Sequence, residues 1–185
     1  RDYPQLPDDA PEPEDVPHSG EHPHLSMTQE NVADSGQTEI DLARFSRVHD
    51  HLGRYINRAR RKLLKVGIFL VEFSNLGDVA RAHGRAASRR VVSRATRRIS
   101  VTVAARGVVA SMATETLVVL MPDIKTTDAA ALVAEELHQD ICRPYEMANG
   151  LFYLQCSVGM SLYPDHGMEP DELIGKADAA LSGTG

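Results

Sequence analysis

The spacing of apolar residues predicts a long helix followed by a buried strand. From Thr38, the expected N-cap, apolar residues recur every three or four positions and form one helical face. The strand covers 65–73, KVGIFLVEF, a nearly unbroken apolar run with β-branched residues. The helical face consists of Phe45, Val48, Leu52, Ile56, Ala59 and Leu63.

The rest of the chain alternates helical and extended patterns. After the first helix the predicted order is β-α-β-β-α-β-α. This order predicts an α+β domain with a ferredoxin-like (split βαβ) antiparallel sheet and helices on its faces. The remaining predicted elements are a helix at about 79–99, hairpin strands near 107–112 and 117–121, a helix at 126–141, a strand at 151–164 and a helix at 169–181.

Charge and proline divide the chain into two parts. Residues 1–37 hold nine acids against Arg1 alone, a charge of -8, so the remainder of the -6 chain is about +2. Six of the ten prolines also lie in this segment. We interpret 1–36 as a flexible arm or linker and 37–185 as the folded domain. His18, His22 and His24 lie in the arm, where we interpret them as solvated linker residues.

Composition restricts the class of protein. No apolar run approaches the ~20 residues of a membrane helix, so we expect no membrane segment in this chain. Cys142 and Cys156 are too few for a disulfide framework and predict buried thiols in a cytoplasmic domain. The chain begins with Arg1 rather than Met, and we therefore expect it to be a piece of a longer protein. A membrane attachment in another part of that protein is compatible with a cytoplasmic domain here.

The tip of the predicted hairpin is unusual. Tight hairpins prefer Gly, Asn or Asp because their central residues need positive φ. Here the four residues between the apolar runs contain none of these types. They are Ala113, Thr114, Glu115 and Thr116.

Three stretches together carry a resemblance to a known family. VASMATETLVVLMPDI resembles the signature hairpin of the GGDEF family, the diguanylate cyclases, which typically reads VARLGGDEFVVLLPDI. SVGMSLYPDHG and KADAAL resemble two further motifs of that family downstream. The resemblance covers about 40–181, and the motifs are specific only when taken together.

The resemblance implies a chemistry for the hairpin. Diguanylate cyclases join two GTP molecules into cyclic di-GMP, with Mg²⁺ held by carboxylates. Ala113 and Thr114 fall on the two family glycines, Glu115 and Thr116 on the two acids, and Leu117 on the Phe. The tip therefore retains one acid.

The resemblance assigns further residues to nucleotide and metal. Glu72 falls on a metal-binding Asp, so Glu72 and Glu115 would hold a metal if one still binds. The backbone of Phe73 and Ser74 would lie against the nucleotide.

The positions that read guanine in the family differ more strongly. An Asn-Asp pair and a later Asp fall here on Ala80, Arg81 and Arg89. Guanine presents N–H donors to these acids, and Arg only donates. The product-inhibition motif R-x-x-D falls on 104–107, which read Ala, Ala, Arg and Gly.

The resemblance therefore implies a degenerate domain with no catalytic residues and no expected cofactor. We predict a catalytically inactive regulatory module of bacterial cyclic di-GMP signalling, which transmits signals or mediates dimerisation. An EAL or sensor domain in the same full-length protein is the expected partner. The alternatives are an allosteric module that binds Mg-GTP and, less favoured, a weak cyclase. Binding of GTP or cyclic di-GMP and the formation of a homodimer stay open.

A function of another class, nucleic-acid binding, rests on arginine. Arg81, Arg85 and Arg89 recur every four residues and predict one basic stripe on the 79–99 helix. RNA-binding ferredoxin-like domains stack bases on exposed aromatics, and this chain has four Phe, five Tyr and no Trp. We disfavour this reading, and the stripe could instead dock the acidic arm.

Overall fold

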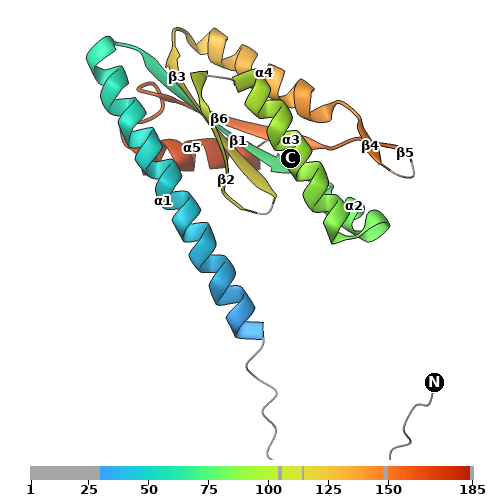
Figure 1. Cartoon of the computed structure of the whole chain (residues 1–185). Helices are drawn as coiled ribbons and strands as arrows, with labels where there is room; N and C mark the ends of the chain where they lie inside the picture. The colour runs from blue at the N-terminus through green and yellow to red at the C-terminus, as the bar shows by residue number, and fades with distance from the viewer. Residues whose placement is uncertain (1–29, 104–105, 114, 148–149, 184–185) are drawn as a thin grey trace, which may run out of the picture.

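The fold is built from eleven helices and strands in the part of the chain that the structure describes (Figure 1). This computed structural model describes residues 30–103, 106–113, 115–147 and 150–183, with side chains from residue 45 onward. The elements are α1 Glu30–Lys62, β1 Lys65–Phe73, α2 Leu76–His83, α3 Arg85–Val103, β2 Val108–Ser111, β3 Thr116–Ile124, α4 Thr127–Cys142, β4 Tyr145–Met147, β5 Gly150–Phe152, β6 Cys156–Tyr163 and α5 Pro170–Ser182.

Four strands form the central sheet in the order β2-β3-β1-β6. Every neighbouring pair is antiparallel, and β1 lies between β3 and β6. The ferredoxin-like α+β prediction is confirmed. The strands β4 and β5 form a separate antiparallel pair.

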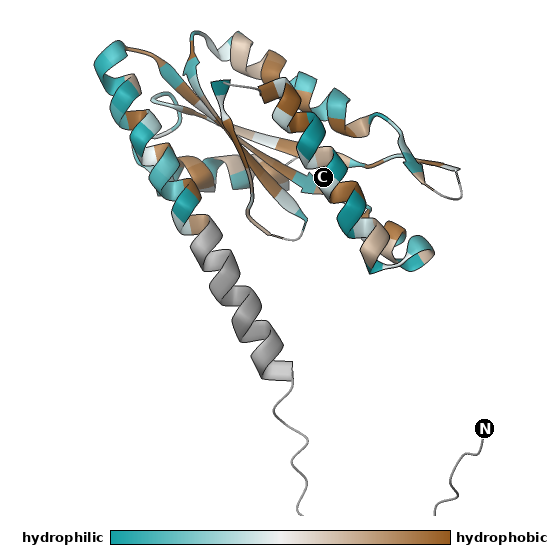
Figure 2. Cartoon of the chain, viewed as in Figure 1, coloured by the Kyte–Doolittle hydropathy of each residue, from teal (hydrophilic) through white to brown (hydrophobic). Residues whose placement is uncertain are grey.

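Helices cover both faces of the sheet. Phe69, Val71 and Phe73 point into a core shared with α2, α3 and α4. The intervening residues of β1, such as Ile68 and Leu70, point into a second core shared with α1 and α5. Successive strand side chains face opposite sides, so a strand covered on both sides needs a continuous apolar run. The sheet is correspondingly brown between its helical layers in Figure 2.

The first helix differs from its prediction at both ends. It begins at Glu30, eight residues before the predicted cap at Thr38. Extending an existing helix adds a hydrogen bond per residue without a new nucleation step, and Glu30, Ala33 and Gln37 are good helix formers. At the other end, Leu63 follows the helix with a φ of 55° and is 95% exposed, so its assignment to the apolar face was wrong.

The predicted helix at 79–99 is in fact two helices. The chain breaks at Gly84, whose φ of 83° lies outside the range of an α-helix. Arg81 therefore belongs to α2, while Arg85 and Arg89 belong to α3. The predicted single stripe of three arginines on one helix was wrong for this reason.

The predicted strand at 151–164 is also divided. Its first part is β5, which pairs with β4 rather than with the main sheet, and only Cys156–Tyr163 joins β1. Residues 1–29 lie outside the described residues, and with them His18, His22, His24 and the proposed docking of the arm. None of the described helices is both long and apolar enough to cross a bilayer.

Candidate functional site

The candidate site lies where β1 ends beside the tip of the β2–β3 hairpin. Glu72 is the penultimate residue of β1 and pairs in register with Thr116 of β3. The next amide along, Phe73 N, donates to Glu115 O at 2.9 Å. The backbone therefore brings Glu72 and Glu115 to the same end of the neighbouring strands β1 and β3, and both residues are exposed. Two carboxylates at one solvent-facing end of the sheet can offer oxygen ligands to a divalent cation.

The hairpin closes without glycine among its described tip residues. Thr116 N donates to Ala113 O at 3.4 Å, and Ala113 N donates back to Thr116 O at 3.3 Å. The Ser111 hydroxyl also donates to Ala113 O at 2.9 Å. This side-chain bond adds a partner for the tip carbonyl. Thr114, predicted to fall on the second family glycine, lies outside the described residues.

Leu117 belongs to the core rather than to the site surface. It follows the tip in β3 and is only 1% exposed, within the core that faces α2, α3 and α4. Its apolar side chain anchors the base of the hairpin. At this position the structure explains the similarity to the family Phe by packing.

The chain that leaves β1 is held against the segment before β6. Phe73 is buried, whereas Ser74 is exposed and its N–H donates to Gln155 O at 3.1 Å. Asn75 makes two further bonds to this segment: its Nδ2 donates to Tyr153 O, and Gln155 N donates to its Oδ1, both at 3.0 Å.

Sequence reasoning missed this role of Asn75. It occupies the N-cap position of α2, but its side chain makes no capping hydrogen bond there. An Asn between a strand and a helix is the only local signal, and that signal points to a cap. Its actual partners lie about 80 residues away in the sequence.

The predicted guanine-reading positions lie on two helices. Ala80 and Arg81 are on α2, and Arg89 is on α3. Arg81 is exposed and forms an ion pair with Asp78 one turn earlier on its own helix. Arg89 is exposed as well. A guanidinium group has N–H donors and no acceptor, so neither arginine can accept a hydrogen bond from a purine N–H.

The predicted product-inhibition positions lie at the other end of the hairpin. Residues 104 and 105 are outside the described part of the chain. Arg106 is exposed and lines a cavity of about 590 Å³ that also includes Tyr55 and Asp123. Gly107 is required by packing, because a Cβ there would lie 2.5 Å from Leu120 O. An aspartate does not fit at position 107 with this backbone.

The sequence matches a family model over nearly the whole folded part. The model, described as "Diguanylate cyclase, GGDEF domain", matches residues 40–184. The chain belongs to the GGDEF family. This domain family is associated with cyclic di-GMP signalling.

Curated relatives of this GGDEF domain are much longer proteins. The "Bifunctional diguanylate cyclase/cyclic di-GMP phosphodiesterase MucR" of Pseudomonas aeruginosa is 28% identical over 132 residues, which are 71% of this chain and 19% of MucR. The "Signaling protein YkoW" of Bacillus subtilis is 22% identical over 142 residues, 76% of this chain and 18% of YkoW. The chain thus spans about a fifth of the length of these relatives.

Solved GGDEF structures share the fold. A sensory box/GGDEF family protein from Caulobacter crescentus superposes with a TM-score of 0.69 at 23% identity, covering 74% of this chain and 90% of that one. The GGDEF domain of TpbB (YfiN) from Pseudomonas aeruginosa gives 0.70 at 20% identity, with 74% and 80% covered. At these identities the likeness concerns the fold.

Proposed function

We propose that this GGDEF domain is catalytically inactive and acts as a regulatory module in cyclic di-GMP signalling. The observation that carries the proposal is arginine at two of the guanine-reading positions, Arg81 and Arg89. A site that must accept hydrogen bonds from guanine discriminates by orders of magnitude against groups that cannot.

The metal-binding side of the site supports the same proposal. Glu72 and Glu115 supply two carboxylates, while Thr116 stands where active relatives carry an acid. A threonine hydroxyl has no charge with which to neutralise Mg²⁺ or the triphosphate. Groups that act as one catalytic unit are strongly non-additive, so losing the metal and base contacts together removes turnover.

The first helix supports a role in transmission. Val48, Leu52, Ile56 and Ala59, in the part of α1 whose side chains are described, are buried against the sheet and α5. At 1.5 Å per residue, the 33 residues of α1 span about 50 Å. A rigid element of this length suits the coupling of the domain to a sensor upstream. The chain covers only a fifth of its bifunctional relative MucR, and we propose an EAL or sensor domain in the same protein as partner and a homodimer as its assembly.

A cyclase assay tests the proposal directly. The purified chain is incubated with GTP and Mg²⁺ or Mn²⁺, and cyclic di-GMP is measured by mass spectrometry beside an active GGDEF domain. We expect no product above the protein-free control. Product that depends on protein concentration and disappears in Glu115→Ala would overturn the proposal.

The second candidate is GTP binding without turnover. It is favoured by the backbone bond from Phe73 N to Glu115 O, which keeps the Glu72 and Glu115 carboxylates at the same end of the sheet. Calorimetric titration with Mg-GTP and with cyclic di-GMP separates the two candidates. Micromolar GTP binding that is lost in Glu72→Ala and kept in Glu136→Ala, an exposed acid on α4, would establish an allosteric nucleotide site. Absence of binding would leave a module that acts through protein contacts.

Nucleic-acid binding receives less support. Both faces of the sheet are covered by helices, so the strands present no aromatic platform for base stacking. Two arginines of α3 are engaged within the domain, since Arg94 donates to Glu146 O and Arg98 to the carbonyls of Arg143 and Pro144.

A further inference from the structure

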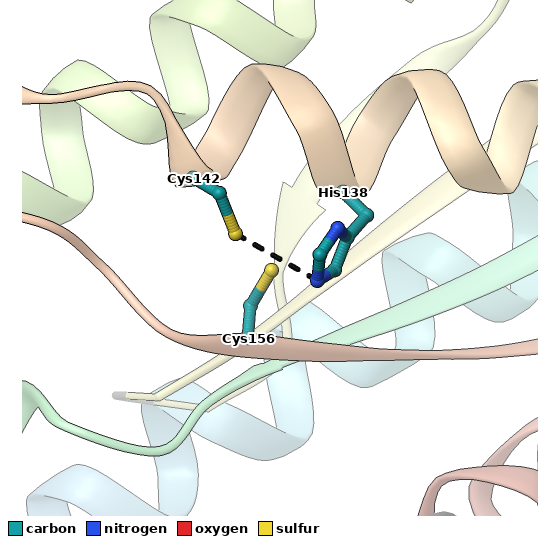
Figure 3. A group of neighbouring side chains, drawn as sticks. All are labelled: His138, Cys142 and Cys156. Carbon is teal, nitrogen blue, oxygen red and sulfur yellow. Dashed lines mark hydrogen bonds between the residues drawn. The ribbon is translucent and has the colours of Figure 1, made fainter.

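Three metal-ligating side chains converge where α4 ends and β6 begins. His138 and Cys142 lie in the last turns of α4, and Cys156 is the first residue of β6 (Figure 3). Their ligand atoms all lie within 4.8 Å of one another. Cys142 Sγ lies 3.7 Å from His138 Nε2. The sequence had suggested that Cys142 and Cys156 were simply buried thiols, yet both are only partly buried.

The surrounding fold explains this convergence. Residues four apart on a helix share a face, which places His138 directly above Cys142. The chain leaving α4 is held by Arg98, which donates to the carbonyls of Asp140, Arg143 and Pro144. Cys156 is fixed independently, because it pairs in register with Phe73 of β1.

The chain beyond α4 is anchored by a buried tyrosine. Tyr145 is 1% exposed, and its hydroxyl donates to Ile141 O at 2.9 Å. The Arg98 guanidinium stacks over the Tyr145 ring, 4.1 Å from its centroid. The backbone on both sides of the cluster is therefore fixed by contacts that do not involve the side chains of the three ligands.

We propose that His138, Cys142 and Cys156 form a binding site for Zn²⁺. Two thiolates and an imidazole are a donor set that zinc prefers, and three protein ligands leave the fourth tetrahedral position to water. His138 is exposed, so an ion and its water can enter from solvent.

The distances suit this ion. Zinc bonds of about 2.3 Å to sulfur and about 2.0–2.1 Å to nitrogen place tetrahedral donors about 3.6–3.8 Å apart. The separation of 3.7 Å between Cys142 Sγ and His138 Nε2 already matches. The widest separation, at most 4.8 Å, requires a closure of about 1 Å, which side-chain rotation on a helix and a neighbouring strand supplies.

The charges at the site suit a divalent cation. Two thiolates neutralise the ion, and the C-terminal end of α4 carries the negative end of the helix dipole.

A bound ion would connect to the candidate site at the end of β1. The residue before Cys156, Gln155, bonds through its backbone to Ser74 and Asn75. Zinc would cross-link α4 to β6 and so restrict the motion of the segment before β6, which makes these contacts. Amide exchange at Gln155 is expected to slow when zinc is bound.

The test uses the full chain, reduced with a phosphine that does not bind zinc. Zinc is added in the presence of a chromogenic chelator, and Co²⁺ is used as a spectroscopic substitute. We expect one ion per chain and sulfur-to-cobalt charge-transfer bands. Cys142→Ser and Cys156→Ser should each abolish tight binding, and His138→Ala should weaken it by more than about ten-fold. Far-UV circular dichroism checks that each variant is folded.

The controls separate this site from other histidines. His83→Ala changes a histidine of α2 and should leave the affinity unchanged. The triple variant His18→Ala, His22→Ala and His24→Ala removes the N-terminal histidines and should also leave the cobalt bands intact.

Alkylation provides a measurement that does not depend on variants. Zinc should protect both Cys142 and Cys156 from iodoacetamide in the unmodified chain. Failure of zinc to protect either thiol, or metal uptake that survives both cysteine substitutions, would overturn the proposal. A reduced chain that takes up no metal and only forms a Cys142–Cys156 disulfide on oxidation would overturn it as well.

Discussion

Replacing Gly159 by Ala should loosen the layer formed by α5. Gly159 lies in β6, and a Cβ there would meet Ala177 O at 2.1 Å and Leu181 Cγ at 2.8 Å. The first of these atoms is helix backbone, which cannot rotate away. This contact explains why the SVGMSLYP stretch carries a glycine at this position.

The magnitude follows from the distance. A carbon normally approaches a carbonyl oxygen to about 3.3 Å, so α5 must move outward by about 1.2 Å. A gap of about 1 Å forfeits about half of the contact energy of the apolar side chains beneath the helix. Leu173, Ile174 and Leu181 contribute about 2 kcal/mol each when buried, so about 3 kcal/mol of about 6 kcal/mol is lost.

A smaller effect acts in the opposite direction. Alanine has less freedom than glycine in the unfolded chain, which offsets the loss by about 0.5–1 kcal/mol. The expected net decrease in the free energy of unfolding is therefore about 2 kcal/mol. For a domain of this size, this corresponds to a melting temperature lower by about 4–8 °C.

Urea unfolding followed by far-UV circular dichroism measures this difference. Gly175→Ala is the matched control, because Gly175 is an exposed residue of α5 and a Cβ added there would meet no atom within 4 Å. That substitution should stabilise the helix by about 0.8–1 kcal/mol. The reasoning is refuted if Gly159→Ala unfolds within about 0.5 kcal/mol of the parent chain, or if both variants lose stability equally.

Three further predictions concern polar contacts. The Lys65 ammonium holds the pKa of Asp165 below its usual value, so the pair stabilises the fold above about pH 4 and is lost at lower pH. In Asp165→Asn, the urea concentration at the unfolding midpoint should therefore decrease less steeply below pH 4 than in the parent chain. Burial raises the pKa of Tyr145 to about 12, so one tyrosine should ionise late in an absorbance titration and be missing in Tyr145→Phe. Because the pKa of Tyr145 is higher in the folded than in the unfolded chain, the free energy of unfolding should decrease as the pH rises from about 10 to 12. Asn75→Ala removes two hydrogen bonds, which should reduce stability by about 1–2 kcal/mol and speed amide exchange at Gln155, whereas Asn57→Ala on the exposed side of α1 should not.

Local patterns were enough for the elements with strong signals. The strand at 65–73 was predicted at its observed bounds, because its apolar run is flanked by a basic helix end and by Ser74 and Asn75. The helix at 126–141 was also predicted to within one residue at each end, and the Thr126 hydroxyl caps it by accepting a bond from Ala129 N at 3.1 Å. These features depend on neighbours within a few residues.

Elements with weaker local signals were missed. The break at Gly84 was not predicted because a glycine inside a helical pattern is compatible with an unbroken helix. The strands β4 and β5 have three residues each, too few to establish a period of two. The start of α1 was placed late because acidic residues and a glycine resemble a linker in composition.

The sequence by itself determined the family, the order of the main strands, and the amino acids available at the hairpin tip. Those properties follow from the types of residue and from their spacing along the chain. Only the tertiary structure decided that Asn75 holds the segment before β6 and that Cys156 meets His138 and Cys142. Such contacts join residues of different elements, and their separation in space depends on how helices and strands pack rather than on any local period. The same packing decides that Gly107 and Gly159 have no room for a Cβ.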